Sequence, residues 1–354
     1  MRILHGISSV GIQATRYLSD ELRRLGHDSQ IVVYRGNPLL VGYEDQNLGI
    51  DPSKPLMLPA FGLRVARFFL HALRNYDVYH FHFGHSLLPL NLDLPLLRVL
   101  GKRVIMEYHG SDVRRRSVFE LKNPFAAEFP VASLLDDRTG RRRQRRIARY
   151  VNAVIVQDAE LREHLFPFTT NVHTVPLRTD LSKFGLDDHP PHGKIVIAHA
   201  PSRSDVKGTT HIVEAVDRLS RQYDLGFKLV TGASHDEVLR VCAEADIVID
   251  QLLLGTYGML SVEGMALGKP VVCYIRDDLL DSYGGQLPIC QATVETVEAV
   301  LQTLVEDPAL RQTQGRLGRA FVEEIHDVRA LAAQIVDLYA GNVVMPRTGT
   351  EARR

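Results

Sequence analysis

The 354-residue chain has no tryptophan, only three cysteines and no excess of either charge. Lys and Arg number 42, as do Asp and Glu, and hydrophobic residues make up 45%, which is typical of a globular protein. Cys242, Cys273 and Cys290 are far apart, with no CxxC pair and no Cys/His cluster, so no zinc site is predicted. Cys242 and Cys273 lie in apolar patterns and are expected to be buried thiols. This cysteine usage fits a reducing cytoplasm, and we expect a cytoplasmic protein.

Long hydrophobic runs are also missing. The longest candidate, residues 87–97, contains Asn91, Asp93 and two prolines, and it falls short of the about 18 apolar residues of a membrane helix. The chain starts with a strand pattern at Arg2–Ile7 and shows no signal-peptide core. We therefore expect neither a transmembrane helix nor a secretion signal, and we expect a disordered tail at 345–354.

Several motifs that would name a reaction are absent. The first turn, GISSVGIQ, places Gly6 and Gly11 five residues apart, and no G-x-G-x-x-G opens a strand–helix pair. This absence disfavours an NAD(P)-dependent dehydrogenase. The chain has no Walker A lysine motif, no HExxH and no G-x-S-x-G, which disfavours zincins and α/β-hydrolases.

What the sequence does contain is a regular alternation of strand and helix patterns, which predicts parallel sheets with helices on both faces. The segment LDDHPPHG (186–193) is polar, carries two prolines and is the best linker candidate. We predict an α/β protein with two doubly wound Rossmann-like domains, 1–185 and 186–325, that face a central cleft. A helix and tail at 326–354 are expected to pack back on the first domain. Ligands of such sheets bind beyond the carboxyl ends of the strands.

The most informative segment runs from Ala245 to Tyr274. It predicts a buried strand, a loop with Gly255 and Gly258, a short helix over 258–267 and a second buried strand. A helix N-terminus beside exposed backbone amides can bind an anion, and Glu263 follows about one and a half turns inside the helix. We expect a nucleotide ligand to bind here.

These residues resemble glycosyltransferase family 4, the retaining, metal-independent nucleotide-sugar transferases of the two-domain GT-B fold. The stretch GMLSVEGMALGKPVV (258–272) is similar to the family's EGFGLVLLEAMACGKPVV-type signature. Glu263 matches the second acid of the E-x7-E pair, and the resemblance implies that it accepts hydrogen bonds from the donor ribose. The alternative is a glutamate on the helix surface.

The first acid of that pair would fall at Gly255, which has no side chain to bind a sugar hydroxyl. In the family this acid contacts the transferred sugar. We therefore expect the backbone around Tyr257, Gly258 and Met259 to bind more of the sugar and phosphate. The missing acid also leaves open a protein that binds a sugar nucleotide without catalysis.

The segment HAPSRSDVKG (199–208) is similar to the family's strand–loop segment with an Arg and a Lys before a glycine. Arg203 and Lys207 match these positions, and the resemblance implies that both hold the donor diphosphate during catalysis. Without a metal, fixed cations must stabilise the charge that develops on the leaving diphosphate. The alternative is a surface charge cluster, with Asp205 as an ion-pair partner.

Two further places in the first half match the family. In EYHGSDVR (107–114), His109 matches the histidine that reaches the donor sugar and the leaving group, although a structural histidine is the alternative. The first turn, with Ser9 and Gly11, takes the place of the family's glycine-rich loop that contacts donor phosphate and acceptor. VPLRTDLSKF (175–184) is similar to the family's connector between domains.

Charge is unevenly distributed between the two parts of the chain. Residues 1–170 hold 24 Lys and Arg against 17 Asp and Glu, and the remainder holds 18 against 25. RRRQRRIAR (141–149) concentrates six arginines on a predicted helix. A phosphate-bearing acceptor, an anionic lipid surface, a solvated helix face or another partner would each explain this density. Nucleic acid is not expected, because no stacking aromatics interleave with the arginines.

Together these residues predict a retaining hexosyltransferase-type glycosyltransferase active in glycan biosynthesis. Its co-substrate is a nucleotide diphosphate sugar, no cofactor or metal is expected, and the acceptor is a glycan, a lipid-linked or a small molecule. Peripheral contact with the inner membrane face is expected through the basic half. The alternatives are a GT-B-type nucleotide-sugar epimerase and a non-catalytic sugar-nucleotide-binding partner.

Overall fold

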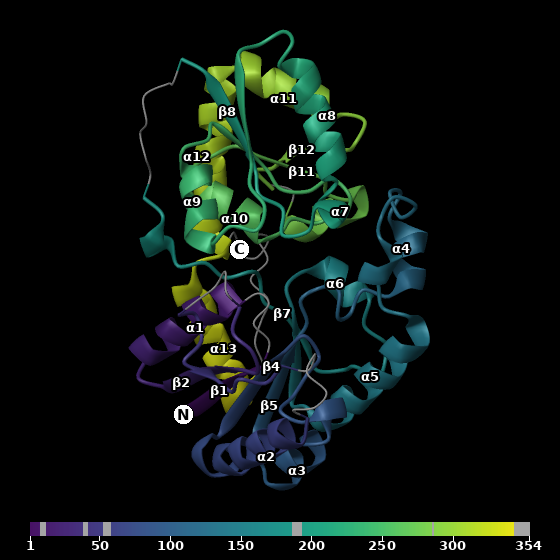
Figure 1. Ribbon diagram of the computed structural model, residues 1–354, viewed down its shortest axis with the longest axis vertical. Coiled ribbons are helices and arrows are strands. Elements are labelled where there is room, and N and C mark those ends of the chain that lie inside the picture. Colours follow the sequence, from purple (N-terminus) through teal and green to yellow (C-terminus); the bar gives the residue numbers. More distant parts are fainter. Residues whose placement is uncertain (8–11, 38–41, 52–57, 186–192, 285–286, 343–354) are drawn as a thin grey trace. The chain divides into compact units, whose positions relative to one another are not determined.

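The computed structural model describes residues 1–7, 12–37, 42–51, 58–185, 193–284 and 287–342 (Figure 1). The chain divides into two compact units. Unit 1 holds Met1–Val118, Leu134–Arg178 and the chain from Val328, and unit 2 holds Phe119–Ser133 and Thr179–Asp327. The predicted domain ranges remain predictions, and most of the predicted linker, 186–192, lies outside the described residues.

Unit 1 is built on a parallel sheet with the strand order β3-β2-β1-β4-β5-β6-β7. The strands are β1 (Arg2–Ile7), β2 (Asp28–Val33), β3 (Gln46–Asn47), β4 (Val78–His82), β5 (Arg103–Glu107), β6 (Ala153–Val156) and β7 (Val172–Thr174). Every residue of β4 and β6 is buried, because central parallel strands are covered on both faces. Because β1, β4 and β5 are parallel neighbours, their carboxyl ends meet at one edge of the sheet.

Helices cover both faces of this sheet. They are α1 (Ile12–Arg24), α2 (Leu58–Asn75), α3 (Leu94–Val99), α5 (Asp137–Tyr150), α6 (Ala159–Glu163) and α13 (Val328–Ala340), and α4 (Arg116–Lys122) spans the border between the units. On one face, α1 and α13 lie side by side over Ile3 and Ile105 (Figure 1). On the other face, α2, α3 and α5 pack over Leu4 and Met106.

Unit 2 has a second parallel sheet, with the order β12-β11-β10-β8-β9. Its strands are β8 (Ile195–His199), β9 (Leu225–Leu229), β10 (Ile247–Ile249), β11 (Val271–Cys273) and β12 (Cys290–Gln291). Its helices are α7 (Ser204–Lys207), α8 (Thr209–Leu219), α9 (His235–Ala243), α10 (Met259–Ala266), α11 (Val297–Glu306) and α12 (Pro308–Ile325). Helices α8 and α11 share a core with Ile197, Ile249 and Val272 on one face.

Local sequence signals explain where several helices begin. Asp136 precedes α5 and its side chain accepts a hydrogen bond from Thr139 N, and Ser234 caps α9 in the same way. Asp307 caps α12, and Pro308 is its first residue, where the missing N–H costs nothing. Asp136, Ser234 and Asp307 thus mark where α5, α9 and α12 begin.

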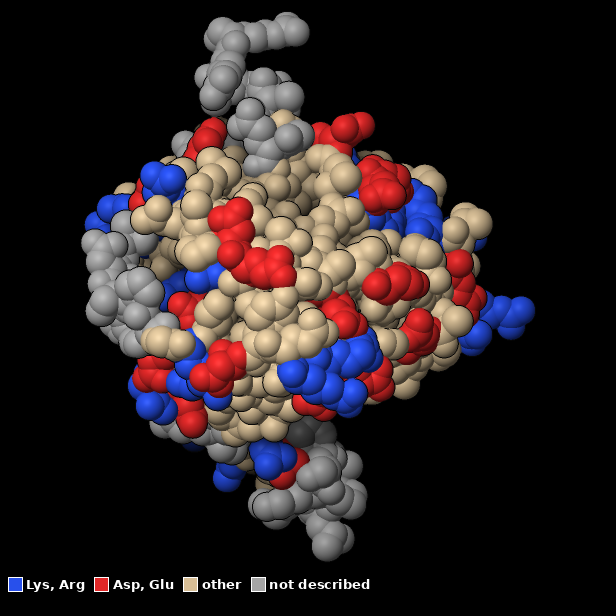
Figure 2. All heavy atoms as spheres, turned by 90° about the horizontal axis from the view of Figure 1, so that it is seen from above, with Lys and Arg blue, Asp and Glu red and all other residues tan. Residues whose placement is uncertain are grey.

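Other expectations can be compared directly. Cys242 and Cys273 are free and buried, as predicted. Within the described residues, no helix is long and apolar enough to cross a membrane. On the face seen in Figure 2, basic and acidic side chains are interspersed, without a large area of one sign.

Candidate functional site

A buried carboxylate at the end of β10 organises the predicted donor site in unit 2. Asp250 Oδ1 accepts a hydrogen bond from Lys207 Nζ at 2.7 Å. Its Oδ2 accepts hydrogen bonds from Gly258 N and Ser261 Oγ, both at 2.7 Å. Burial alone would raise the pKa of Asp250, but the Lys207 ammonium and these hydrogen bonds outweigh burial and lower it. Asp250 is therefore an anion that fixes Lys207 against the start of α10.

The two predicted cations lie on one helical turn. Lys207 ends α7, and its Nζ also donates to Gln251 Oε1 at 2.7 Å. An ammonium has three N–H donors, so these two bonds account for two of them. Arg203 is the N-cap of α7, its side chain is 49% exposed, and its Nη2 lies 2.5 Å from Asp205 Oδ2. Lys207 is thus anchored, whereas Arg203 is held only by a surface carboxylate.

Gly258 allows the loop before α10 to approach these charges closely. A Cβ at this position would lie 3.1 Å from Asp250 Oδ2 and 3.1 Å from Lys207 Nζ. Gly258 is the N-cap of α10, and Met259 is the first helical residue. N–H groups of a first helical turn point out of the helix end, where they attract anions. A lysine ammonium and a helix N-terminus therefore converge at one point.

Glu263 lies further inside α10 and is only 3% exposed. Its Oε1 is 2.7 Å from Nε2 of His235, the first residue of α9, which is also buried. It is therefore not a glutamate on the helix surface. This arrangement shows that the carboxylate is held in a fixed position. Its role toward a ribose remains a prediction.

The Gly255 position, where the family signature has an acid, is shaped by a buried arginine. Gly255 has a φ of +82°, and a Cβ there would lie 2.7 Å from Arg276 Cγ. Arg276 is 2% exposed, donates its backbone N–H to Gly255 O at 2.9 Å and forms two hydrogen bonds to Asp278. The arginine stem thus fills the space that a side chain at position 255 would need.

This contact gives a stability prediction. The Gly255→Ala variant is expected to lower the free energy of unfolding by about 1–3 kcal/mol, because it adds left-handed backbone strain and a clash with Arg276. Gly232→Ala is the matched control, since Gly232 has a φ of +66° and nothing within 4 Å of a Cβ. Urea unfolding compares the two variants. Equal losses would show that the Arg276 contact contributes nothing.

Tyr257 directs its side chain into unit 2. The ring is buried, packs against Tyr283 and Phe321, and its hydroxyl lies 3.2 Å from His326 Nε2. Its side chain is thus used within the fold, and the backbone is the part that remains for a ligand. The expectation that the backbone around Tyr257, Gly258 and Met259 binds the sugar and phosphate remains a prediction.

In unit 1, His109 follows β5 and is held by its neighbours. Asp112 Oδ1 accepts hydrogen bonds from His109 N at 3.0 Å and Gly110 N at 2.8 Å. The imidazole stacks on Phe83 with 4.4 Å between ring centroids, and its Nε2 is 3.1 Å from His82 Nδ1. Burial lowers the pKa of His109, so the ring is neutral at pH 7.

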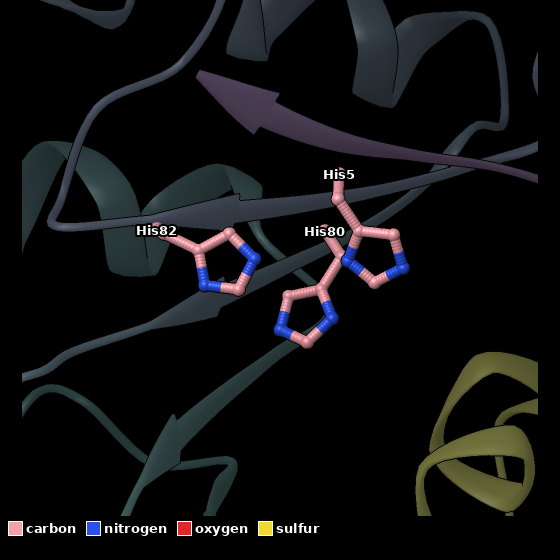
Figure 3. Close-up of side chains that lie close together, drawn as sticks. All are labelled: His5, His80 and His82. Atoms are coloured by element: carbon pink, nitrogen blue, oxygen red, sulfur yellow. The ribbon is translucent and has the colours of Figure 1, made fainter. Parts of the chain in front are cut away.

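More histidines gather beside His109 at the carboxyl ends of β1 and β4. His5 pairs in register with His80, and His82 follows on the same face of β4 (Figure 3). His80 Nδ1 lies 2.7 Å from the Tyr339 hydroxyl, whereas neither ring nitrogen of His5 has a hydrogen-bond partner in the described structure. Burial lowers the pKa of all three rings, so this group is neutral at pH 7.

A buried ion pair supports this cluster. Arg178 Nη2 donates to both Glu107 oxygens, at 2.7 and 2.9 Å. His80 Nε2 lies 3.1 Å from Glu107 Oε2. Burial would raise the pKa of Glu107, but Arg178 and His80 outweigh burial and hold it well below its usual range.

Two overlapping sets in this cluster have the spacing of metal ligands. They are His5, His80 and His82, and His82, Glu107 and His109. The Tyr339 hydroxyl lies 2.7 Å from His80 Nδ1, and the Arg178 cation binds Glu107, the carboxylate of the second set. A cation next to the site disfavours a divalent metal, so these residues fit one poorly.

The structure brings together some of the predicted residues and leaves others apart. Lys207 and Gly258 meet at Asp250, and Arg203 and Glu263 lie on the adjoining helices α7 and α10 of unit 2. His109 belongs to unit 1 and is described with that unit alone. Gly11 and Ser9 lie outside the described residues, so their predicted roles remain predictions.

Residues 13–183 match the family model described as Glycosyltransferase Family 4. The MMP alpha-(1->4)-mannosyltransferase of Mycolicibacterium hassiacum is 25% identical, and the match covers 92% of this chain and 92% of the relative. These two similarities support a glycosyltransferase of the family 4 type.

Solved structures of other proteins share the fold of this chain. Sucrose-phosphate synthase from Thermosynechococcus elongatus aligns with a TM-score of 0.67 at 16% identity, covering 96% of this chain and 98% of that one. Anabaena Alr3699/HepE in complex with UDP-glucose also aligns with a TM-score of 0.67, at 15% identity, covering 96% and 99%. The predicted α/β GT-B fold with two parallel sheets is confirmed.

Sequence reasoning missed three buried side chains that hold this glycosyltransferase's predicted donor site in place. They are Asp250, His235 and Arg276. Asp250 lies near the end of the buried strand that opens the segment 245–274, and a charge at the end of such a strand is the signal that could have revealed it. His235 and Arg276 reach the site through packing between elements, which no local pattern reveals.

Proposed function

We propose that this glycosyltransferase moves a sugar from a nucleotide diphosphate sugar to an acceptor hydroxyl, with retention of anomeric configuration and without a metal. The observation that supports this most is the position of Lys207, which Asp250 holds beside the N-terminus of α10. A fixed cation and a helix N-terminus are what a leaving diphosphate needs when no metal neutralises its charge.

The chemistry follows from these donors. Breaking the bond between sugar and phosphate leaves additional negative charge on the diphosphate, and the third N–H of the Lys207 ammonium is placed to donate to it. Arg203 would exchange Asp205 for a phosphate oxygen, since its side chain is 49% exposed and can move. The Met259 amide in the first turn of α10 would complete this half of the site, since the Gly258 N–H already donates to Asp250.

Other residues would hold the rest of the donor. Glu263, fixed by His235, would accept hydrogen bonds from two vicinal ribose hydroxyls, as a carboxylate with two oxygens can. His109 would contact the sugar as a neutral imidazole, and Gly11 the donor phosphate. In this proposal the acceptor attacks from the face that the leaving group departs, and a phosphate oxygen takes its proton.

The relatives suggest the substrate classes. One solved structure with the same fold is a complex with UDP-glucose, and the curated relative is named a mannosyltransferase. A nucleotide-activated hexose as donor and a sugar as acceptor are therefore the first substrates to test. A cytoplasmic location and peripheral contact with a membrane remain predictions.

A ligand screen tests the proposal. UDP-, GDP-, ADP- and dTDP-sugars are added to the protein in the presence of EDTA, and thermal unfolding is followed. A donor at about 100 times its dissociation constant should add about 2.7 kcal/mol of stability. The anomeric configuration of the product is then determined by NMR. No shift with any nucleotide sugar, or an inverted product, would overturn the proposal.

A further inference from the structure

A pocket of about 330 Å³ lies in unit 1, away from the residues assigned to the donor. One wall is the loop after β4, and the other is α5. The residues that line it are Gly84, His85, Leu90, Asn91, Thr139, Arg142, Arg143 and Arg146. The lining is rich in hydrogen-bond donors and contains no acidic residue.

The loop wall is held in a strained conformation. Phe83, Leu90 and Asn91 are the non-glycine residues with positive φ in the described chain, at +57°, +56° and +58°. Buried Asp93 holds the loop by accepting hydrogen bonds from Leu87 N at 3.0 Å and Leu88 N at 3.2 Å. Strained backbone persists where the surroundings impose it, and such places are often binding sites.

Asn91 ties this wall together from inside. Its Oδ1 accepts hydrogen bonds from Ser86 N at 2.9 Å and Ser86 Oγ at 3.0 Å, and its Nδ2 donates to Gly84 O at 3.1 Å. The loop is thus a rigid wall rather than a loose surface segment.

The helix wall supplies three uncompensated charges. Arg143 donates to the carbonyls of Phe83 and Gly84, and Arg146 donates to Leu90 O at 2.6 Å. These acceptors are neutral, and no ion pair with a carboxylate is found for Arg142, Arg143 or Arg146 among the described residues. The pocket therefore concentrates positive charge that the protein does not neutralise.

The other arginines of α5 behave differently. Arg141 and Arg145 lie over the rings of Phe166 and Phe168, at 5.7 and 5.3 Å, and Arg149 lies over Tyr150 at 5.7 Å. The arginine-rich helix thus has one group on aromatic rings outside the pocket and a second group that lines it. A helix that needed only a solvated basic face would not require a hollow of this size.

We propose that this pocket binds a phosphate group carried by the acceptor. This inference rests on the proposed transferase function and names a feature of its acceptor. Guanidinium groups bind phosphate oxygens in pairs with fixed geometry, and a helix that holds three of them in a pocket is suited to a phosphate monoester. Thr139 and His85 add hydrogen-bonding groups of the kind that complete such a site.

The position of the pocket fits an acceptor subsite. Phe83 connects it to His109, because the Phe83 ring stacks on the His109 imidazole and the Phe83 carbonyl accepts from Arg143. Strands β4 and β5 are neighbours, so both features stand at the same edge of the unit 1 sheet. A phosphate held here leaves the remainder of the acceptor to extend toward the histidine proposed to contact the sugar.

Binding of inorganic phosphate to the full chain tests the proposal without an activity assay. Phosphate is titrated at constant ionic strength set with chloride, and binding is followed by thermal unfolding and calorimetry. The Arg142→Ala variant should bind about tenfold more weakly, because it loses a charge-assisted hydrogen bond while the loop contacts of Arg143 and Arg146 remain. Arg149→Ala removes the same charge from the same helix outside the pocket and should bind like the parent protein.

Three outcomes separate the possibilities. A loss confined to Arg142→Ala supports the pocket, whereas equal weakening by Arg142→Ala and Arg149→Ala, or no phosphate binding, overturns it. Co-sedimentation with vesicles of phosphatidylcholine with and without phosphatidylglycerol tests a lipid surface, and vesicle binding without phosphate binding also overturns it. The Arg142→Ala variant should bind nucleotide sugars as the parent protein does. If the parent protein binds no nucleotide sugar, the proposed transferase function is overturned, whatever the result for phosphate.

Discussion

Replacing Lys207 by alanine is expected to reduce the rate of sugar transfer by about 10²-fold, the effect of removing one donor that stabilises developing charge. The ammonium lies beside the N-terminus of α10 with two of its donors used by Asp250 and Gln251. Its remaining donor would act on the departing diphosphate, so the loss should fall mainly on turnover. Steady-state kinetics with the donor found in the ligand screen measures it.

The same substitution leaves Asp250 buried without its cation, which is expected to destabilise unit 2 by several kcal/mol. Arg203→Ala avoids this problem, because among the described residues the ion-pair partner of Arg203 is the exposed Asp205, and Arg203 itself is half-exposed. Arg240→Ala is the matched control, since Arg240 is a 65% exposed arginine of unit 2 with an exposed carboxylate one turn away. Near-normal transfer by folded Lys207→Ala and Arg203→Ala would show that these cations do not serve the diphosphate.

Much of this fold was predictable because its signals are local. Parallel strands buried on both faces are continuous apolar runs, and helices with capping residues begin where the sequence indicates. Helix α10 and strands β10 and β11 therefore lie where the glycine-rich segment 245–274 predicts them. The two-residue strands β3 and β12 were missed, because two residues carry no periodicity.

The candidate site was only partly predictable, for a related reason. The cations Arg203 and Lys207 and the acid Glu263 stand in motifs that can be recognised one segment at a time. Their partners depend on which elements the fold brings together: Asp250 lies 43 residues after Lys207, and His235 lies 28 residues before Glu263. Such pairs are set by strand order and helix packing, which the sequence pattern does not specify.

Gly255 shows the same limit in another form. The sequence shows that an acid is missing there, but it does not show that Arg276 occupies the space. The left-handed backbone and the arginine stem together explain why a longer side chain is not accommodated. A glutamate introduced at position 255 would therefore require Arg276 to move, so the substitution alone is not expected to create a formed acid site.

Lowering the pH from about 7 to about 5 is expected to destabilise unit 1 strongly. Burial lowers the pKa of His5, His80, His82 and His109, while an unfolded histidine titrates near pH 6.5. The unfolded chain therefore binds more protons than the folded chain below about pH 6.5. The stability present above that pH is lost as the pH falls toward the lower pKa values of the folded state, and each such histidine adds up to about 1.4 kcal/mol per pH unit to the slope.

The charged and titratable groups that face these rings determine which ionisation contributes to the loss of stability between pH 5 and 7. Glu107 carries a lowered pKa and stays ionised to well below pH 4.5, so its protonation does not contribute between pH 5 and 7. The Arg178 guanidinium opposes protonation of His80, and Tyr339 stays neutral because burial raises its pKa further. Histidine protonation is thus the process expected to control unit 1 in this interval.

His5→Leu provides the decisive variant, because the His5 ring is fully buried and has no hydrogen-bond partner in the described structure to lose. Below about pH 6.5, this variant should reduce the slope of the unfolding free energy against pH by up to about 1.4 kcal/mol per pH unit, which corresponds to one proton. It should also be more stable than the parent protein at pH 5. His71→Leu, on the exposed face of α2, is the control and should leave the slope unchanged. Since the chain lacks tryptophan, urea unfolding is followed by circular dichroism at several pH values. If His5→Leu and the parent protein show the same slope, buried histidines are not what couples the stability of unit 1 to pH.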